Sequence, residues 1–222
     1  VLVDWGFFPQ VSCRCLFVMS PYVSMKHSLF ALTLASCLAF AACTDTTGLS
    51  ETSSRVSRGN PNSGVTVMEF ADLQCPACRS AHSLVNAPLL EKYGSKVRFT
   101  YKHFPLRSLH IYALDAAQAS ECAADQGKFW EFVDLNYEKQ DELSRDIFST
   151  WATELGLDVE LFNRCVESDI KRKTVMSDYE EGQALGVNGT PTYFVNGVRV
   201  TSTVAEISKA IDAAISGNGV RL

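Results

Sequence analysis

The chain has 222 residues, of which 46% are hydrophobic and 20% are charged. This composition fits one or two folded domains and excludes a disordered chain or a collagen-like polymer. The formal net charge is −5, and the longest basic run is Lys171–Lys173, so binding to nucleic acid is not indicated. Eight cysteines are unusual for a cytosolic protein of this size, and half of them lie before Thr44.

The N-terminal region has the pattern of a secretory signal. A basic residue, Lys26, follows Met25, and an uncharged apolar run extends from Leu29 to Ala42. A membrane-spanning helix needs ~20 apolar residues, so a permanent span is the weaker interpretation. We therefore expect residues 25–42 to be a cleaved signal peptide.

Residues 1–24 show no helical or strand period and precede the better start at Met25. They indicate a misassigned start codon and an unstructured segment. The alternative is a signal peptide with a long N-terminal region.

The end of the apolar run, Leu38–Cys43 (LAFAAC), resembles a bacterial lipobox, in which the cysteine is acylated and becomes the new N-terminus. This resemblance implies that Cys43 carries lipid and anchors an exported protein to the extracytoplasmic face of a bacterial membrane, in the periplasm or cell envelope. The alternative is ordinary cleavage after an Ala-x-Ala-like site. Residues 43–63 are rich in Ser, Thr, Gly and Asn, which predicts a flexible tether.

The first elements of the folded part are a strand, a helix and a second strand. Val65–Ala71 is a nearly continuous apolar run, typical of a central strand, and contains one acid, Glu69. The motif Cys75–Cys78 (CPAC) follows, before apolar residues at helical spacing, so the cysteine pair lies where a strand turns into a helix. Alternation of apolar and polar residues over Lys96–Lys102 predicts the second strand.

A long helical pattern separates these elements from the C-terminal ones. It extends over Phe104–Thr190. Two short strands and a helix are predicted after it: Thr192–Asn196, Val198–Thr201 and Val204–Ile215, with Asn196–Gly197 as the hairpin turn.

This order of elements is that of the thioredoxin fold, and the helical interruption is that of its DsbA-like variant. Four ordered segments resemble the DsbA-like thiol oxidoreductases of bacterial envelopes: GNPNSGVTVMEFADLQCPACR, FTYKHFPL, ECAADQGKFWEF and GVNGTPTYFVNG. The resemblance implies an α/β, thioredoxin-like domain over residues 64–216 with an inserted all-helical subdomain. The thioredoxin part would comprise residues 64–103 and 187–216, and the insertion residues 104–186.

The two cysteines of the CPAC motif are the candidate redox-active disulfide. A helix N-terminus presents unpaired N–H groups to Cys75, which favours its thiolate, so Cys75 is expected to be the nucleophile. Cys78 can close a ring with Cys75 and release a bound partner. The alternatives are an inert bridge and half of a zinc site, but zinc needs four ligands and the mature chain has no second CxxC or His pair. We expect neither a metal nor a cofactor.

The resemblance implies two further site features. The Thr190–Pro191 bond would be cis and face the CxxC motif, leaving the backbone of Thr190 to pair with an extended substrate. Glu69 would be a buried acid behind Cys78 that exchanges a proton with it. Taken alone, Pro191 is an ordinary trans proline in a turn, and Glu69 is a partly exposed carboxylate at a strand end.

The other polar and aromatic candidates are interpreted as structural. Asp72 and Gln74 flank the site and shape it. The histidines and the aromatic group of the insertion are expected to be packed or solvated: His82, His103, His110, Phe129, Trp130 and Phe132.

Cys122 and Cys165 remain once the N-terminal cysteines and the CPAC pair are set aside. Both lie in predicted helices of the insertion, so a structural disulfide between them is plausible in an oxidising compartment. The alternative is two separate buried thiols.

The expected function is an extracytoplasmic thiol-disulfide oxidoreductase that donates its CPAC disulfide to reduced or unfolded secreted proteins. A membrane partner, such as a quinone-linked reoxidase, would restore the disulfide. The alternatives are a disulfide isomerase or reductase kept reduced by a membrane electron donor, and a thioredoxin-like binding or chaperone module without catalysis. Ala77 offers neither a polar nor an aromatic contact, so the redox strength of the pair stays open.

The first testable prediction is that Cys43 carries lipid. Mass spectrometry of the mature N-terminus is expected to find an acylated Cys43, because the short apolar run ends in Ala41, Ala42 and Cys43. An unacylated N-terminus at any residue would contradict this, and one at Thr44 or beyond would indicate simple secretion.

Overall fold

A computed structural model describes residues 46–217, and the predictions for the signal peptide, the lipid site and the start codon lie outside these residues. The compact unit begins at Gly48. Its strands are β1 (Arg58–Gly59), β2 (Thr66–Ala71), β3 (Arg98–His103), β4 (Thr192–Val195) and β5 (Val198–Val200). Its helices are α1 (Pro76–Ala81), α2 (Ala87–Tyr93), α3 (Ala113–Ala124), α4 (Phe129–Glu138), α5 (Ile147–Glu154), α6 (Val159–Glu167), α7 (Arg172–Ala184) and α8 (Val204–Ile215), with a π turn η1 (His82–Asn86) and a 3-10 turn η2 (Gln140–Glu142).

The strands within the described residues form one sheet in the order β1-β3-β2-β4-β5. Strand β2 lies at the centre, parallel to β3 and antiparallel to β4. A central strand has neighbours on both sides, which agrees with the nearly continuous apolar run predicted for it. The β4–β5 hairpin turns at Asn196 and Gly197, which have φ values of 47° and 82°, and the backbone there is left-handed as such turns require.

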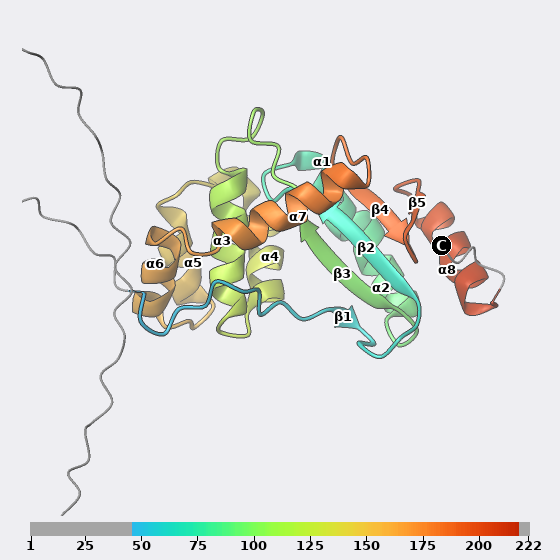
Figure 1. The fold of residues 1–222 in the computed structure, drawn as a ribbon, viewed down its shortest axis with the longest axis horizontal. Helices are drawn as coiled ribbons and strands as arrows, with labels where there is room; N and C mark the ends of the chain where they lie inside the picture. Colours follow the sequence, from blue (N-terminus) through green and yellow to red (C-terminus); the bar gives the residue numbers. More distant parts are fainter. Residues whose placement is uncertain (1–45, 218–222) are drawn as a thin grey trace, which may run out of the picture. The chain divides into compact units, whose positions relative to one another are not determined.

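Helices cover both faces of the sheet. Figure 1 shows α7 crossing in front of β2 and β3 and α2 lying behind them, and α8 packs against β4, β5 and α2. Helices α3 to α6 pack together as a separate group, from which α7 returns to the sheet. The α/β, thioredoxin-like fold with a helical insertion is confirmed.

The helical segment after the CPAC motif contains a π turn. The N–H of Ala87 donates to the carbonyl of His82, five residues earlier, where an α-helix would use the fourth. The next residue, Pro88, has no N–H and its ring would clash with the carbonyl four residues before it. The wider turn removes this conflict and lets α1, η1 and α2 continue as one rod.

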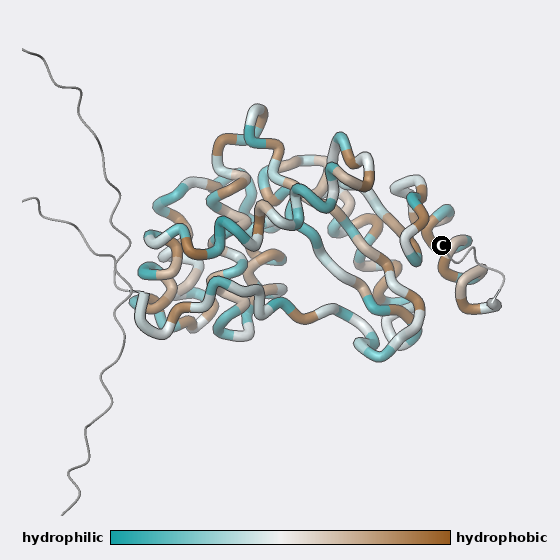
Figure 2. The backbone as a smooth tube through the Cα atoms, in the orientation of Figure 1, coloured by the Kyte–Doolittle hydropathy of each residue, from teal (hydrophilic) through white to brown (hydrophobic). Residues whose placement is uncertain are grey.

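Four aromatic side chains of the insertion belong to the main apolar core of the molecule. Phe132, Phe148, Trp151 and Phe162 are fully buried and contact one another edge-on or tilted. Hydrophobic and hydrophilic residues alternate along its helices, as Figure 2 shows, so apolar faces are available to meet.

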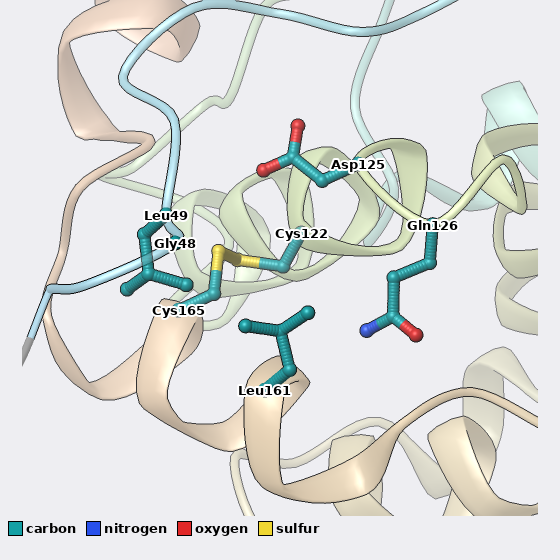
Figure 3. Close-up of a pocket in the computed structure, with 7 residues that line it drawn as sticks. All are labelled: Gly48, Leu49, Cys122, Asp125, Gln126, Leu161 and Cys165. Atoms are coloured by element: carbon teal, nitrogen blue, oxygen red, sulfur yellow. A yellow bond between two sulfur atoms is a disulfide. The ribbon is translucent and has the colours of Figure 1, made fainter.

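A disulfide joins α3 to α6 in this group. It links Cys122 and Cys165, which are 43 positions apart. For a loop of this length, the chain-entropy model gives roughly 4 kcal/mol of stabilisation as an upper range. Figure 3 shows Leu49 beside the bridge, so the start of the compact unit covers it.

The structure differs from the sequence prediction in residues 48–63, which we call the N-terminal strap. They were expected to belong to a flexible tether, but they lie along the domain and contribute strand β1, which pairs antiparallel with β3. The Nε1 of Trp130 donates to the carbonyl of Val56 at 2.8 Å, and the fully buried Nζ of Lys171 donates to the carbonyl of Thr52 at 2.7 Å. The acceptors in these bonds are backbone carbonyls, which every residue has. The side-chain composition of the strap therefore does not indicate that it is bound to the domain.

Arg55 is the central contact of the strap. Its guanidinium pairs with Glu121 on α3 and with Asp178 on α7, each at 2.7 Å, and donates to the carbonyl of Tyr101 at 2.9 Å. Its side chain is only 12% exposed, and both carboxylates are more deeply buried. One arginine therefore connects the strap, the sheet and the insertion.

No helix among residues 46–217 has both the length and the hydrophobicity needed to span a membrane.

The second prediction is that Arg55→Ala lowers the free energy of unfolding by about 2 kcal/mol, because it removes the arginine from two buried carboxylates, of which Glu121 then keeps His103 and Asp178 keeps Lys102 and the N–H of His103. Urea denaturation measures the change. Arg145→Ala is the matched control: Arg145 pairs with Asp115 but is 65% exposed, so its loss is expected to cost less than about 1 kcal/mol. Equal effects of the two substitutions would contradict a structural role for the strap.

Candidate redox site

The CPAC motif begins directly at the start of α1. Cys75 is the N-cap residue, with extended backbone (φ −76°, ψ 121°), and Pro76 occupies the first turn, as predicted. The N–H groups of this turn have no partner within the helix and point toward the cysteine. Both cysteines are free thiols in the structure, so the site is described in its reduced form.

The environment of Cys75 favours a thiolate. Hydrogen bonding from the Cys78 thiol is the largest effect, and Thr190 and the backbone N–H groups of Cys78 and Ala77 add to it. Together they outweigh partial burial and lower the pKa of Cys75 from 9.0 to about 5. At neutral pH the Cys75 sulfur is therefore an anion.

Cys78 has the opposite environment. It is fully buried, and burial together with the negative charge of Cys75 raises the pKa of Cys78 well above its usual 9.0. The nearest backbone donor is the N–H of Asp72, whose nitrogen lies 3.5 Å from the Cys78 sulfur. The two thiols thus differ as a nucleophile and a protected resolving thiol would.

Glu69 is buried, with 1% exposure, in the central strand. Burial raises the pKa of Glu69 from 4.5 to about 7, against the lowering effects of Tyr193, Asn86 and His82. The negative charge of Glu69 adds a smaller contribution to the raised pKa of Cys78. The alternative of a partly exposed strand-end carboxylate does not fit this burial.

The loop before β4 brings Thr190 to the cysteines. The Thr190–Pro191 bond is cis, and the carbonyl oxygen of Thr190 lies 3.6 Å from the Cys75 sulfur. The structure therefore brings the Thr190–Pro191 segment to Cys75, and Glu69 lies buried in the central strand that precedes the CPAC motif.

Asp72 was expected only to flank the site, and the structure gives it a larger part. Its buried carboxylate accepts from the backbone N–H groups of Gln74 (2.7 Å) and Leu106 (2.8 Å) and bonds the ring of His110 (2.8 Å). Its carbonyl accepts the N–H of Cys75 at 3.1 Å. Asp72 therefore fixes the turn that presents Cys75. His110 supports this turn through its hydrogen bond to the Asp72 carboxylate.

Side chains of the insertion hold the same turn from the other side. Asn136 on α4 and Gln140 in η2 both donate to the carbonyl of Leu73, at 2.6 and 2.9 Å, and Gln140 also donates to the carbonyl of Cys75 at 3.2 Å. These two amides were not found from the sequence, because nothing local distinguishes them from other helical polar residues.

The remaining histidines and aromatic residues have structural contacts, as expected. His82 pairs with Asp134 at 2.9 Å, and His103 is buried against Glu121 at 3.0 Å. The aromatic residues of α4 that were considered as a groove, Phe129, Trp130 and Phe132, are buried.

A family model described as thioredoxin matches residues 51–213. The chain belongs to the thioredoxin family. The matched range includes the CPAC motif, the helical insertion and most of the strap. The predicted resemblance is thus confirmed at the level of the family.

Solved structures agree with this assignment. A thioredoxin-like oxidoreductase from Silicibacter pomeroyi DSS-3 is 30% identical, with a TM-score of 0.61 over 74% of this chain and 92% of that one. BdbD from Bacillus subtilis has a TM-score of 0.67 at 22% identity, covering 74% and 94% of the two chains. Wolbachia pipientis alpha-DsbA1 has a TM-score of 0.64 at 22% identity, covering 73% and 91%. The chain therefore has the DsbA-type thioredoxin fold.

Curated relatives of similar sequence are much longer proteins. The chain is 41% identical over 142 residues to Na(+)/H(+) antiporter NhaA 3 of Salinispora tropica and 35% identical over 144 residues to Na(+)/H(+) antiporter NhaA 1 of Mycolicibacterium vanbaalenii. Each match covers 64% of this chain but only 22% or 23% of the relative. The chain thus spans less than a quarter of these relatives.

The third prediction concerns the reactivity of the two thiols. In the reduced protein, the rate of alkylation of Cys75 should rise with an inflection near pH 5, while Cys78 stays unreactive until the protein unfolds. Mass spectrometry after alkylation over a pH series measures both, and Cys75→Ser is the control that assigns the reactive site. An inflection near 9.0, the usual value for a thiol, would contradict the described environment.

Proposed function

We propose that this protein is an extracytoplasmic thiol-disulfide oxidoreductase that donates its Cys75–Cys78 disulfide to secreted or envelope proteins. The observation that supports this most directly is the contrast between the two thiols of one CPAC motif. Cys75 has a pKa lowered to about 5, and the pKa of the buried Cys78 is raised. An inert structural bridge needs no such contrast.

The low pKa of Cys75 also supports the direction of transfer. The pKa of Cys75 in the folded protein lies below the usual thiol value, so its thiolate stabilises the reduced protein. This stabilisation is complete above about pH 9, decreases as the pH falls below that value, and is lost as the pH falls through about 5. The disulfide form has no thiolate and gains nothing from these contacts. A stabilised reduced form makes the pair a stronger oxidant, so it tends to pass its disulfide to a client.

The reaction proceeds in two balanced steps. A client thiolate attacks the sulfur of Cys75; a mixed disulfide forms, the Cys75–Cys78 bond breaks, and Cys78 leaves as a thiolate that takes the proton of Glu69. A second client thiolate then attacks the client sulfur of the mixed disulfide and releases Cys75 as a thiolate. The client loses two electrons to the CPAC pair and gains a disulfide.

Client binding is proposed to depend mainly on backbone groups. Thr190 lies beside the Cys75 sulfur, two residues before β4 begins, where an extended chain could pair with its backbone. Pairing of this kind uses N–H and carbonyl groups that all sequences share, so many unfolded clients can be accepted.

The reduced pair must be reoxidised after each turnover. We propose that a membrane protein linked to quinones accepts the two electrons, and that lipid on Cys43 keeps the domain beside it. Sodium-proton antiport is named for relatives of which this chain matches less than a quarter, and the matched part gives no reason to extend that activity to this protein.

The fourth prediction tests the roles of the two cysteines. With a reduced unfolded test protein, Cys75→Ser should abolish disulfide transfer, and Cys78→Ser should accumulate mixed disulfides, because the thiol that resolves them is missing. Non-reducing electrophoresis with peptide mapping identifies the linked cysteine. Adducts through a residue other than Cys75 would show that the roles are wrong.

The direction of transfer needs a separate measurement. The reduction potential of the Cys75–Cys78 pair and its redox state in the cell should show an oxidising pair held in the disulfide form. A pair kept reduced would indicate an isomerase or reductase, and a pair inert to thiols would indicate a binding module.

A further inference from the structure

Glu69 lies between two tyrosines that occupy equivalent positions in the sheet. In the strand register it is opposite Tyr101 on β3 and opposite Tyr193 on β4. The two hydroxyl groups have different partners: that of Tyr101 lies 3.0 Å from the hydroxyl of Tyr137, whereas that of Tyr193 lies 2.9 Å from Oε1 of Glu69. The sheet therefore offers a natural pair for comparison.

Asn86 completes a closed set of contacts around the acid. Its Nδ2 lies 2.9 Å from Oε2 of Glu69, and its Oδ1 lies 2.7 Å from the hydroxyl oxygen of Tyr193. With the contact of Tyr193 to Glu69, three side chains form a ring of three hydrogen-bond distances. All three are buried, with 1%, 3% and 0% exposure for Glu69, Asn86 and Tyr193.

A count of protons shows which form of Glu69 completes this ring. The hydroxyl of Tyr193 has one proton, although it lies within bonding distance of two acceptors. Asn86 contributes one further proton, from its amide group to a single ring contact. An ionised Glu69 contributes none, so two protons serve three contacts and one contact places two acceptors together.

A protonated Glu69 removes this conflict. Its proton goes to the oxygen of Tyr193, the proton of Tyr193 goes to Oδ1 of Asn86, and Nδ2 of Asn86 donates to Oε2 of Glu69. Rotating the amide of Asn86 by half a turn exchanges its donor and acceptor and reverses the direction of the ring, but three protons are still required. The conclusion is therefore independent of how the amide is oriented.

We propose that Asn86 and Tyr193 are positioning residues that close a hydrogen-bonded ring around protonated Glu69 and so hold its proton ready for Cys78. This inference rests on the proposed function, since it names the groups that prepare Glu69 for thiol exchange. When Cys78 leaves as a thiolate, it takes the proton of Glu69, and the ring loses one bond. When Cys78 attacks a mixed disulfide, Glu69 takes its proton back and the ring closes again.

The simpler interpretation is that Tyr193 and Asn86 are only donors to an ionised carboxylate, in which case they lower the pKa of Glu69. The two interpretations predict opposite effects of removing the hydroxyl of Tyr193. Without it, a plain donor is lost and the pKa of Glu69 should rise. If the ring forms, the contacts that remain after this change no longer need a proton from Glu69, so the pKa of Glu69 should fall.

The test is an infrared titration in which the band of the protonated Glu69 carboxyl group is followed over a pH series. The variant Glu69→Gln lacks this band and therefore assigns it to Glu69. For Tyr193→Phe, the midpoint is expected to fall by about one unit, the equivalent of one net hydrogen bond. Tyr101→Phe is the matched control, because it removes a buried hydroxyl from the opposite side of Glu69 without opening the ring, and its midpoint is expected to stay at the wild-type value. A midpoint that rises or is unchanged in Tyr193→Phe would overturn the proposal.

Asn86→Leu serves as the second variant if Tyr193→Phe does not fold. It frees the proton of Tyr193 for Glu69, so the midpoint should again fall, and a rise would contradict the ring. In the wild type, the pH profile for resolving a Cys75 mixed disulfide with a small thiol should follow the same midpoint. The infrared titration needs no client, so the ring can fail while thiol exchange persists, and thiol exchange can fail while the ring is found.

Discussion

A carboxyl group at the centre of the sheet is the constraint on which the redox half of the molecule depends. An unpaired polar group in such a place costs several kcal/mol, so Glu69 needs hydrogen-bond partners from neighbouring elements. Strand β4 supplies Tyr193, and the π turn supplies Asn86. A slip of β4 by one residue would turn Tyr193 to the other face of the sheet. The buried acid thus requires one register and one helix geometry.

The same helical rod connects the proton to the sulfur atoms. It begins at Cys75, buries Cys78 on its inner side, and reaches Asn86 through a turn widened next to Pro88. The nucleophile, the resolving thiol and a partner of the acid are therefore rigidly linked along one element. Cys78 is fully buried, whereas Cys75 receives the hydrogen bond of the Cys78 thiol, and this explains how two cysteines three positions apart can have opposite pKa shifts.

The sequence predicts the order of elements well because periodicity reports which side of an element is buried. It also predicts the hairpin at Asn196–Gly197, whose backbone few other residue pairs would adopt. It does not show that Tyr193 meets Glu69, because strand register depends on contacts between segments far apart in the chain. The prediction that the strap is part of a flexible tether is wrong for a related reason. Arg55 is held by carboxylates on α3 and α7, which are far away in the sequence and do not affect the local composition of the strap.

The strap also changes what a lipid on Cys43 would do. A tether reaching residue 63 would let the domain move far from the membrane, whereas the compact unit already begins at Gly48. Gly48 is five positions after Cys43, and a chain of that length spans at most roughly 18 Å. A lipid-anchored domain would thus remain close to the membrane surface. With Cys43 acylated as predicted, this short reach would favour the proposed membrane partner and would limit clients to proteins that approach the membrane while they are still unfolded.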